Sequence, residues 1–155
     1  MPQMDKGGKF IFGKSLIKED GTLQFPEQAI QEYDIMSEGK VYLITGSKKT
    51  GGFCVTRKGL LAPSKIGHIL NDNPHLRDYA SKEGAFIKYK GRAYSWVKIT
   101  DDGKIFLGDE AMQFLKLKTG MKLLSIRSSD IAFTMGAFGP LVEESLKHES
   151  EIQLY

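Results

Sequence analysis

Residues 41–52, VYLITGSKKTGG, have residue types and a spacing that resemble a phosphate-binding loop. An apolar run leads into Gly46, four residues follow, and Gly51 comes next. Such a loop binds phosphate when it ends in Gly-Lys-Ser/Thr and runs directly into a helix. Here a second glycine and the strand-like stretch FCVT follow instead. We therefore predict a strand-to-strand loop and not a nucleotide site, although Lys48 and Lys49 at its tip are suited to contacting phosphate on a larger ligand.

Few other residues could carry out chemistry. The histidines and the single cysteine are His68, His75, His148 and Cys54. No two histidines have the i, i+4 spacing that places metal ligands on one helix face, and one cysteine cannot complete a zinc site. The cysteine lies in an apolar, strand-like stretch, where a buried and unreactive thiol is expected.

Two pairs of adjacent carboxylates could serve in acid–base catalysis. They are Asp101-Asp102 and Asp109-Glu110. The first pair precedes a hairpin glycine and the second opens an expected helix, where acidic residues interact favourably with the helix dipole. We therefore predict that the chain is not an enzyme, and that it has no catalytic residues, no metal site and no cofactor.

The net charge of +3 is unevenly distributed over the 155 residues. Residues 47–91 contain nine basic and three acidic residues, so the remainder of the chain is slightly acidic. A basic middle segment could attract a polyanion, or it could be a solvated face. No apolar stretch is long enough to cross a bilayer, and the first ten residues lack the apolar core of a signal peptide. We expect a cytoplasmic protein that does not contact membranes.

The chain contains an internal repeat. IKEDGTLQFPEQAIQEYDI, from Ile17, aligns with ITDDGKIFLGDEAMQFLKL, from Ile99, at a spacing of 82 residues. Further on, FCVTRKGLL, from Phe53, aligns with FTMGAFGPL, from Phe133, at a spacing of 80. Because the order of the matches is kept over some fifty positions, the two halves are expected to share one architecture.

Each half predicts the same series of elements. A strand ends in Asp-Gly, a tight turn, and a short second strand follows at residues 23–25 and 105–107. A brief helix comes next, opened in the first half by Pro26. A glycine then leads to another strand, a loop and a last strand at residues 53–56 and 133–136. Helices are expected near residues 64–70 and 141–147.

The segment between the halves predicts a helix started by Pro74 and a hairpin that turns at Lys90-Gly91. This segment has no counterpart in the sequence of the other half. We therefore divide the chain into a first repeat at residues 10–72, a helical and hairpin insertion at residues 73–91, and a second repeat at residues 92–150.

The stretches DGTLQFPEQAIQEYDIMSEGKVYLI (20–44) and DGKIFLGDEAMQFLKLKTGMKLLSI (102–126) resemble the AbrB/SpoVT-type swapped-hairpin family, which includes the MazE-like antitoxins and is related to MraZ. These stretches cover about a third of the chain. The resemblance implies a small β-barrel in which two copies interleave their hairpins, usually as a dimer that binds DNA. Two copies in one chain imply an α+β fold that is mainly β, with a pseudo-dimeric barrel formed within the chain. Such pseudo-dimers can associate further as homodimers.

The sequence departs from the family at positions that usually contact DNA. The arginine expected after the turn glycine is Thr22 in the first half and Lys104 in the second. The resemblance implies a transcriptional regulator that binds double-stranded DNA, mainly through phosphate contacts. The predicted contacts are Lys48, Lys49, Arg57, Lys58, Lys98 and Lys104. The alternative is a non-catalytic barrel that binds a protein partner or a small ligand and has lost DNA binding.

Overall fold

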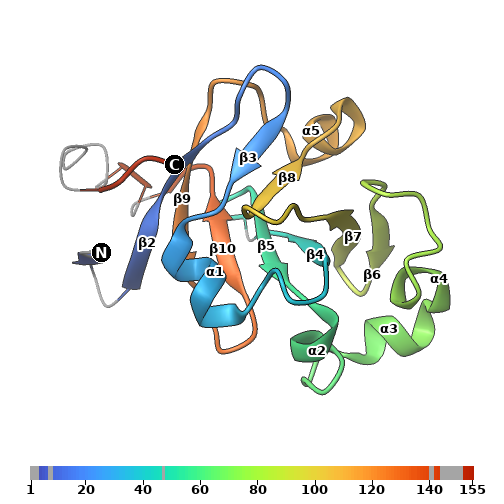
Figure 1. The fold of residues 1–155 in the computed structure, drawn as a ribbon. Coiled ribbons are helices and arrows are strands. Elements are labelled where there is room, and N and C mark those ends of the chain that lie inside the picture. The colour runs from blue at the N-terminus through green and yellow to red at the C-terminus, as the bar shows by residue number, and fades with distance from the viewer. Residues whose placement is uncertain (1–3, 7–8, 47, 140–141, 144–151) are drawn as a thin grey trace.

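The computed structural model describes residues 4–6, 9–46, 48–139, 142–143 and 152–155, and it is built mainly of strands with a few short helices (Figure 1). The strands are β1 (Met4–Lys6), β2 (Lys9–Leu16), β3 (Thr22–Gln24), β4 (Lys40–Thr45), β5 (Phe53–Thr56), β6 (Ile87–Tyr89), β7 (Arg92–Lys98), β8 (Lys104–Phe106), β9 (Lys122–Arg127) and β10 (Phe133–Gly136). The helices are α1 (Glu27–Tyr33), α2 (Lys58–Leu61), α3 (His68–Asp72), α4 (Pro74–Arg77) and α5 (Asp109–Leu115). The mainly β structure predicted from the sequence is confirmed.

Eight strands form one antiparallel sheet in the order β1-β2-β9-β10-β5-β4-β7-β6, and β3 pairs with β8 in a separate two-stranded ribbon. In the large sheet β2 pairs with β9 and β4 pairs with β7, so each half of the chain lends a strand to the other. The halves also meet where β5 pairs with β10. The strand order reads the same from both ends when β1, β2, β4 and β5 are exchanged for β6, β7, β9 and β10.

The register of two strand pairs is centred on residues that the sequence comparison aligns. Leu23 lies opposite Ile105 in the ribbon, and Cys54 lies opposite Thr134 between β5 and β10. The Sγ atom of Cys54 and the Oγ1 atom of Thr134 are 3.4 Å apart. At these two positions the halves of the chain therefore pair in the register that the internal repeat gives.

Several turns have the local causes that the sequence predicts. Lys90 and Gly91 both have positive φ, 48° and 85°, as a two-residue hairpin turn of this kind requires, and they join β6 to β7. Pro26, with φ of −60°, immediately precedes α1. Residues 46–52 join β4 to β5, so the predicted strand-to-strand loop is confirmed.

Three regions differ from the prediction or lie beyond it. Of the helix expected at residues 64–70 only the end is helical, as the start of α3, because residues 62–67, which include Pro63 and Gly67, form the turns between α2 and α3. Most of the helix expected at residues 141–147 lies outside the described residues. β1 has the place beside β2 that β6 has beside β7, a correspondence that the sequence comparison did not detect.

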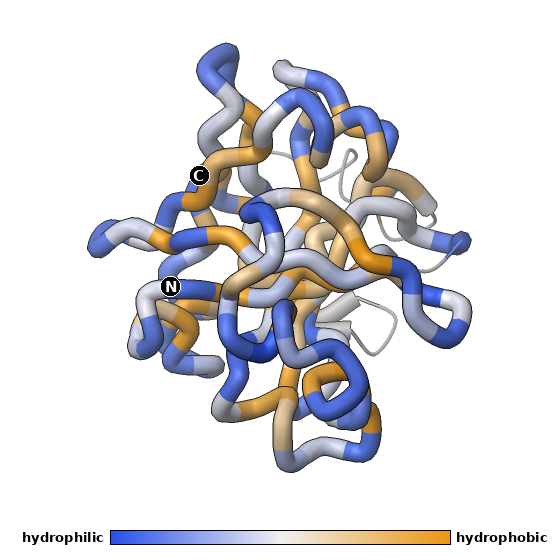
Figure 2. Tube along the Cα trace, turned by 90° about the vertical axis from the view of Figure 1, so that its right-hand side faces the viewer, coloured by the Kyte–Doolittle hydropathy of each residue, from blue (hydrophilic) through white to orange (hydrophobic). Residues whose placement is uncertain are grey.

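The main core lies between the large sheet, the β3–β8 ribbon and helices α1 and α5. At its centre the ring of Phe133 packs against those of Phe12, Phe25 and Tyr33, with ring centroids 6.3, 5.3 and 5.4 Å away. Figure 2 shows the apolar stretches running through the interior, with hydrophilic residues mainly at the projecting turns. Both halves contribute to this cluster, so we expect them to fold as one unit.

A second core lies on the opposite face of β4 and β7 and is covered by α2, α3 and α4. The Tyr42 hydroxyl donates to the carbonyl oxygen of Leu76 (3.1 Å), and the Trp96 indole N–H donates to the carbonyl oxygen of Ser81 (2.9 Å). These bonds attach the helical segment to the sheet. Among the described residues, no helix has the length and apolar character needed to span a bilayer.

Candidate nucleic-acid interface

The residues predicted to contact DNA do not lie together. They are on the loop between β4 and β5 (Lys48, Lys49), around the start of α2 (Arg57, Lys58), at the end of β7 (Lys98) and on β8 (Lys104). Because β4 and β5 are antiparallel neighbours, the loop that joins them lies at the opposite end of these strands from the residues that follow β5. A single DNA surface made of all six side chains is therefore not formed.

Arg57 and Lys58 have partners within the fold. The Arg57 guanidinium donates to the Glu38 carboxylate (2.8 Å) and to the carbonyl oxygen of Tyr33 (2.9 Å), and its side chain is only 18% exposed. The Lys58 ammonium lies 4.3 Å from the centroid of the Tyr79 ring, a cation–π contact. Arg57 thus connects the end of α1 to the start of α2, and neither cation projects freely toward solvent.

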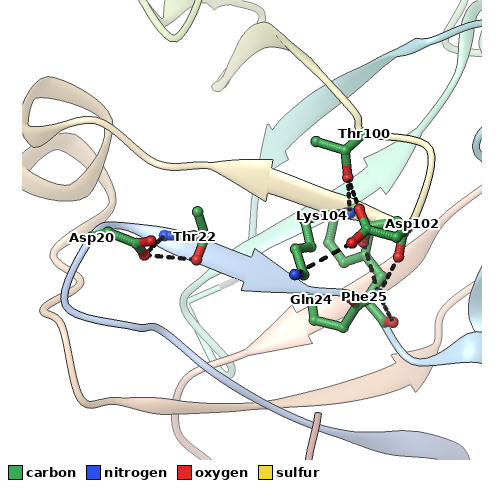
Figure 3. Close-up of polar contacts among 8 residues, drawn as sticks. Asp20, Thr22, Gln24, Phe25, Thr100, Asp102 and Lys104 are labelled. Atoms are coloured by element: carbon green, nitrogen blue, oxygen red, sulfur yellow. Dashed lines mark hydrogen bonds and ion pairs between the residues drawn. The ribbon is translucent and has the colours of Figure 1, made fainter.

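Each end of the β3–β8 ribbon carries a carboxylate, and one of them is paired with the cation of the ribbon, Lys104 (Figure 3). The Lys104 ammonium lies 3.3 Å from a carboxylate oxygen of Asp102, which also accepts a hydrogen bond from the Thr100 hydroxyl. At the other turn Asp20 accepts from the hydroxyl and backbone N–H of Thr22. The hydrogen bond from Thr100 lowers the pKa of Asp102, and that from Thr22 lowers the pKa of Asp20, so both remain charged at neutral pH. This surface does not carry the excess of cations that phosphate binding requires.

Five basic side chains from two segments instead lie at one end of the large sheet. They are Lys48, Lys49, Lys88, Lys90 and Arg92, and we call them the basic end. All five are exposed. The segments are held together because the Arg92 guanidinium donates to the carbonyl oxygen of Thr45 (3.1 Å), only three residues before Lys48.

A pocket of about 470 Å³ opens at the basic end. It is lined by Thr45, Lys88, Tyr89, Lys90, Gly91, Arg92, Ala93 and Phe114. None of these described lining residues is acidic. Phe114 comes from α5 in the second half of the chain, and its ring stacks on that of Phe86, with the centroids 4.7 Å apart and the planes 2° from parallel. The pocket thus combines three cations with an aromatic wall.

The acidic residue Asp72 is hydrogen-bonded to Tyr89, one of the residues that line this pocket. Its carboxylate accepts a hydrogen bond from the Tyr89 hydroxyl, and this bond raises the pKa of Tyr89. The Lys90 ammonium lies 5.3 Å from the centroid of the Tyr89 ring on the same hairpin. The tyrosine therefore stands between the carboxylate of α3 and the cations of the hairpin.

Sequence reasoning selected two of the five residues of the basic end. It did not select Lys88, Lys90 and Arg92, because the first two lie within the segment interpreted as an insertion between the repeats and Arg92 directly follows it. The signal that could have found them is the alternation of basic residues about the Lys90-Gly91 turn, since a tight hairpin brings residues on both sides of its turn together.

The remaining residues that could carry out chemistry are Cys54 and the side chains that could bind a metal ion. Burial raises the pKa of the Cys54 thiol, which disfavours the reactive thiolate. Among the described residues, no group of three or more histidine, cysteine or acidic side chains is arranged to hold a metal ion.

No protein-family model matches this chain, and no curated protein shows significant similarity to it.

Proposed function

We propose that the protein binds DNA through the basic end, with its lysines and Arg92 contacting backbone phosphates. The observation that carries this proposal is the joining of five exposed cations from two segments beside a pocket whose described lining has no acidic residue. Contacts of this kind supply affinity and position the protein, and they carry little sequence information. The β6–β7 hairpin forms one edge of the large sheet, and its turn lies at the basic end.

We also propose that the chain is a fused pseudo-dimer of the AbrB/SpoVT type and acts as a transcriptional regulator. The exchange of β2 and β7 between the halves supports this proposal, as does the register centred on Leu23 with Ile105 and on Cys54 with Thr134. A half of this chain alone would leave strand edges unpaired and part of a core exposed, which favours pairing within one chain. DNA contact would then come from the basic end, since the cation on the ribbon is paired with a carboxylate.

The test of DNA binding removes three charges from the basic end. In a variant carrying Lys88→Gln, Lys90→Gln and Arg92→Gln, we expect the affinity for a 24-base-pair duplex to fall about 100-fold near 0.1 M salt. The plot of log affinity against log salt should become shallower by about 3, because three phosphate contacts are lost. Fluorescence anisotropy over a series of salt concentrations measures both quantities.

A matched control removes the same charge elsewhere. Lys18→Gln, Lys65→Gln and Lys118→Gln change three exposed lysines that do not belong to the basic end. This control should leave the salt slope close to that of the wild type. An equal loss of affinity in both triple variants would mean that net charge alone attracts DNA, and it would remove the basic end as a site.

A second prediction concerns the loop between β4 and β5. Lys48→Ala combined with Lys49→Ala should weaken binding to all duplex sequences and make the salt slope shallower by about 2. The reason is that phosphate contacts do not distinguish bases. Anisotropy with two duplexes of unrelated sequence measures the effect; unchanged affinity and slope would show that this loop does not contact DNA.

One separate observation favours the alternative function, the binding of a protein partner. The side chain of Phe106 on β8 is 59% exposed beside a pocket of about 320 Å³ that also includes Glu83, Asp109 and Glu110. This pocket suits a peptide segment with apolar and basic side chains. If the wild type binds no duplex even at low salt, this alternative becomes the working function, and Phe106→Ser is the variant that should abolish partner binding.

A further inference from the structure

The position of Phe114 on α5 does not by itself call for an aromatic side chain. In the repeat, the position of Phe114 on α5 corresponds to Glu32 on α1, and Glu32 forms an ion pair with Arg127. Phe114 remains 41% exposed although its ring stacks on Phe86. An aromatic ring thus stands where the other half carries a charged side chain, and this ring lines the pocket of the basic end.

The surroundings of the Phe114 ring have the two features that proteins use to bind single-stranded nucleic acid. Proteins that bind single-stranded nucleic acid combine a positively charged groove with aromatic side chains on which bases stack. Here the ring of Phe114, with Phe86 stacked on it, supplies the aromatic surface, and the adjacent lining supplies Lys88, Lys90 and Arg92. A base within a duplex is stacked between its neighbours and cannot reach such a surface, whereas an unpaired base can.

The size and composition of the pocket agree with a base and its flanking phosphates. Its volume of about 470 Å³ falls in the range of small-molecule sites. Thr45 and Ala93 contribute small side chains to its lining. The cations lie along a turn, so more than one phosphate of a strand can be contacted at once.

We infer that the protein binds single-stranded DNA at this pocket, with an unpaired base stacked on Phe114 and the adjacent phosphates contacted by Lys88, Lys90 and Arg92. This inference rests on the proposed DNA binding and specifies the form of DNA that the pocket takes. It separates two contributions: the basic end attracts any DNA, and the aromatic wall adds affinity only for strands with free bases.

The test compares Phe114→Leu with the wild type on three labelled probes. They are an oligothymidine of 12 nucleotides, an abasic strand of 12 nucleotides and a 24-base-pair duplex. Leucine keeps an apolar side chain but removes the ring. We expect affinity for oligothymidine to fall about tenfold, since one stacked base is lost. Affinities for the abasic strand and the duplex should be unchanged, because their binding does not involve the ring.

Two further variants test whether the aromatic ring at position 114 is responsible for the loss of affinity. Phe114→Trp should retain binding to oligothymidine, and the fluorescence of the new indole should be quenched on binding. Phe106→Leu, which alters an exposed phenylalanine outside the pocket, should leave all three affinities unchanged.

The outcomes distinguish this inference from the proposed function. An unchanged affinity of Phe114→Leu for oligothymidine, with salt-dependent duplex binding intact, overturns the inference and leaves the proposed function standing. Equal losses on all three probes, or the same loss in Phe106→Leu, also overturn it. Absence of binding to every probe at low salt overturns both.

Discussion

Replacing Gly52 by alanine is expected to destabilise the protein by about 2–5 kcal/mol. Gly52 has φ of 62°, a left-handed conformation that costs other residues about 1–2 kcal/mol. A Cβ atom added there would lie 1.9 Å from the carbonyl oxygen of Met135 on β10. The overlap is with backbone, so it is relieved only by moving strands, and such overpacking typically costs a further 1–3 kcal/mol.

Urea unfolding measures this loss, and Gly39→Ala is the matched control. Gly39 has a similar φ of 72°, but a Cβ atom there would meet nothing within 4 Å. The control should therefore lose only about 1–2 kcal/mol, the part due to backbone conformation. Equal effects of the two substitutions would show that the close approach of Met135 to Gly52 does not contribute.

The second large effect is expected from Phe133→Ala, which should cost about 3–5 kcal/mol. Phe133 is fully buried, and its ring packs against three aromatic rings that all come from the first half of the chain. Because the cavity would open between the halves, both should lose stability together. Trp96 fluorescence and far-UV circular dichroism should give coincident urea transitions, shifted equally to lower urea concentration.

The control for this prediction is Phe106→Ala, which removes a ring that is 59% exposed. It should cost less than about 1 kcal/mol, because little apolar area is returned to water. Two separate transitions in the Phe133 variant would contradict the shared core, since they would mean that the halves unfold independently.

Elements with local signals could be predicted from the sequence, and contacts between distant segments could not. The strand-like stretch FCVT at residues 53–56, its repeat counterpart at residues 133–136 and the Lys90-Gly91 turn are recognisable within a few residues each. Pro63 and Gly67 are the local signals for the turns between α2 and α3. The pairing of β2 with β9 depends on residues about a hundred positions apart, for which a single sequence gives no direct signal.

The candidate site was predictable to a similar degree. Lys48 and Lys49 are predicted as contacts from the sequence of their own loop, and in the structure they belong to the basic end. The partners of Arg57 and Lys58 are Glu38 and Tyr79, about twenty residues away in the sequence, and only the fold brings them together. The aromatic wall of the pocket depends on the contact of Phe114 with the distant hairpin, which no spacing rule indicates.

The pairing of strands from the two halves determines which parts of the sheet can form while the chain is being synthesised. β2 pairs with β9, which follows it by more than a hundred residues, and β5 cannot complete its pairing until β10 has been synthesised. Closing such long loops before any contact is gained slows folding. The emerging chain therefore carries unpaired strands until residues 133–136 have left the ribosome, and a truncated product that ends before them leaves β5 and β9 with open edges, where aggregation begins.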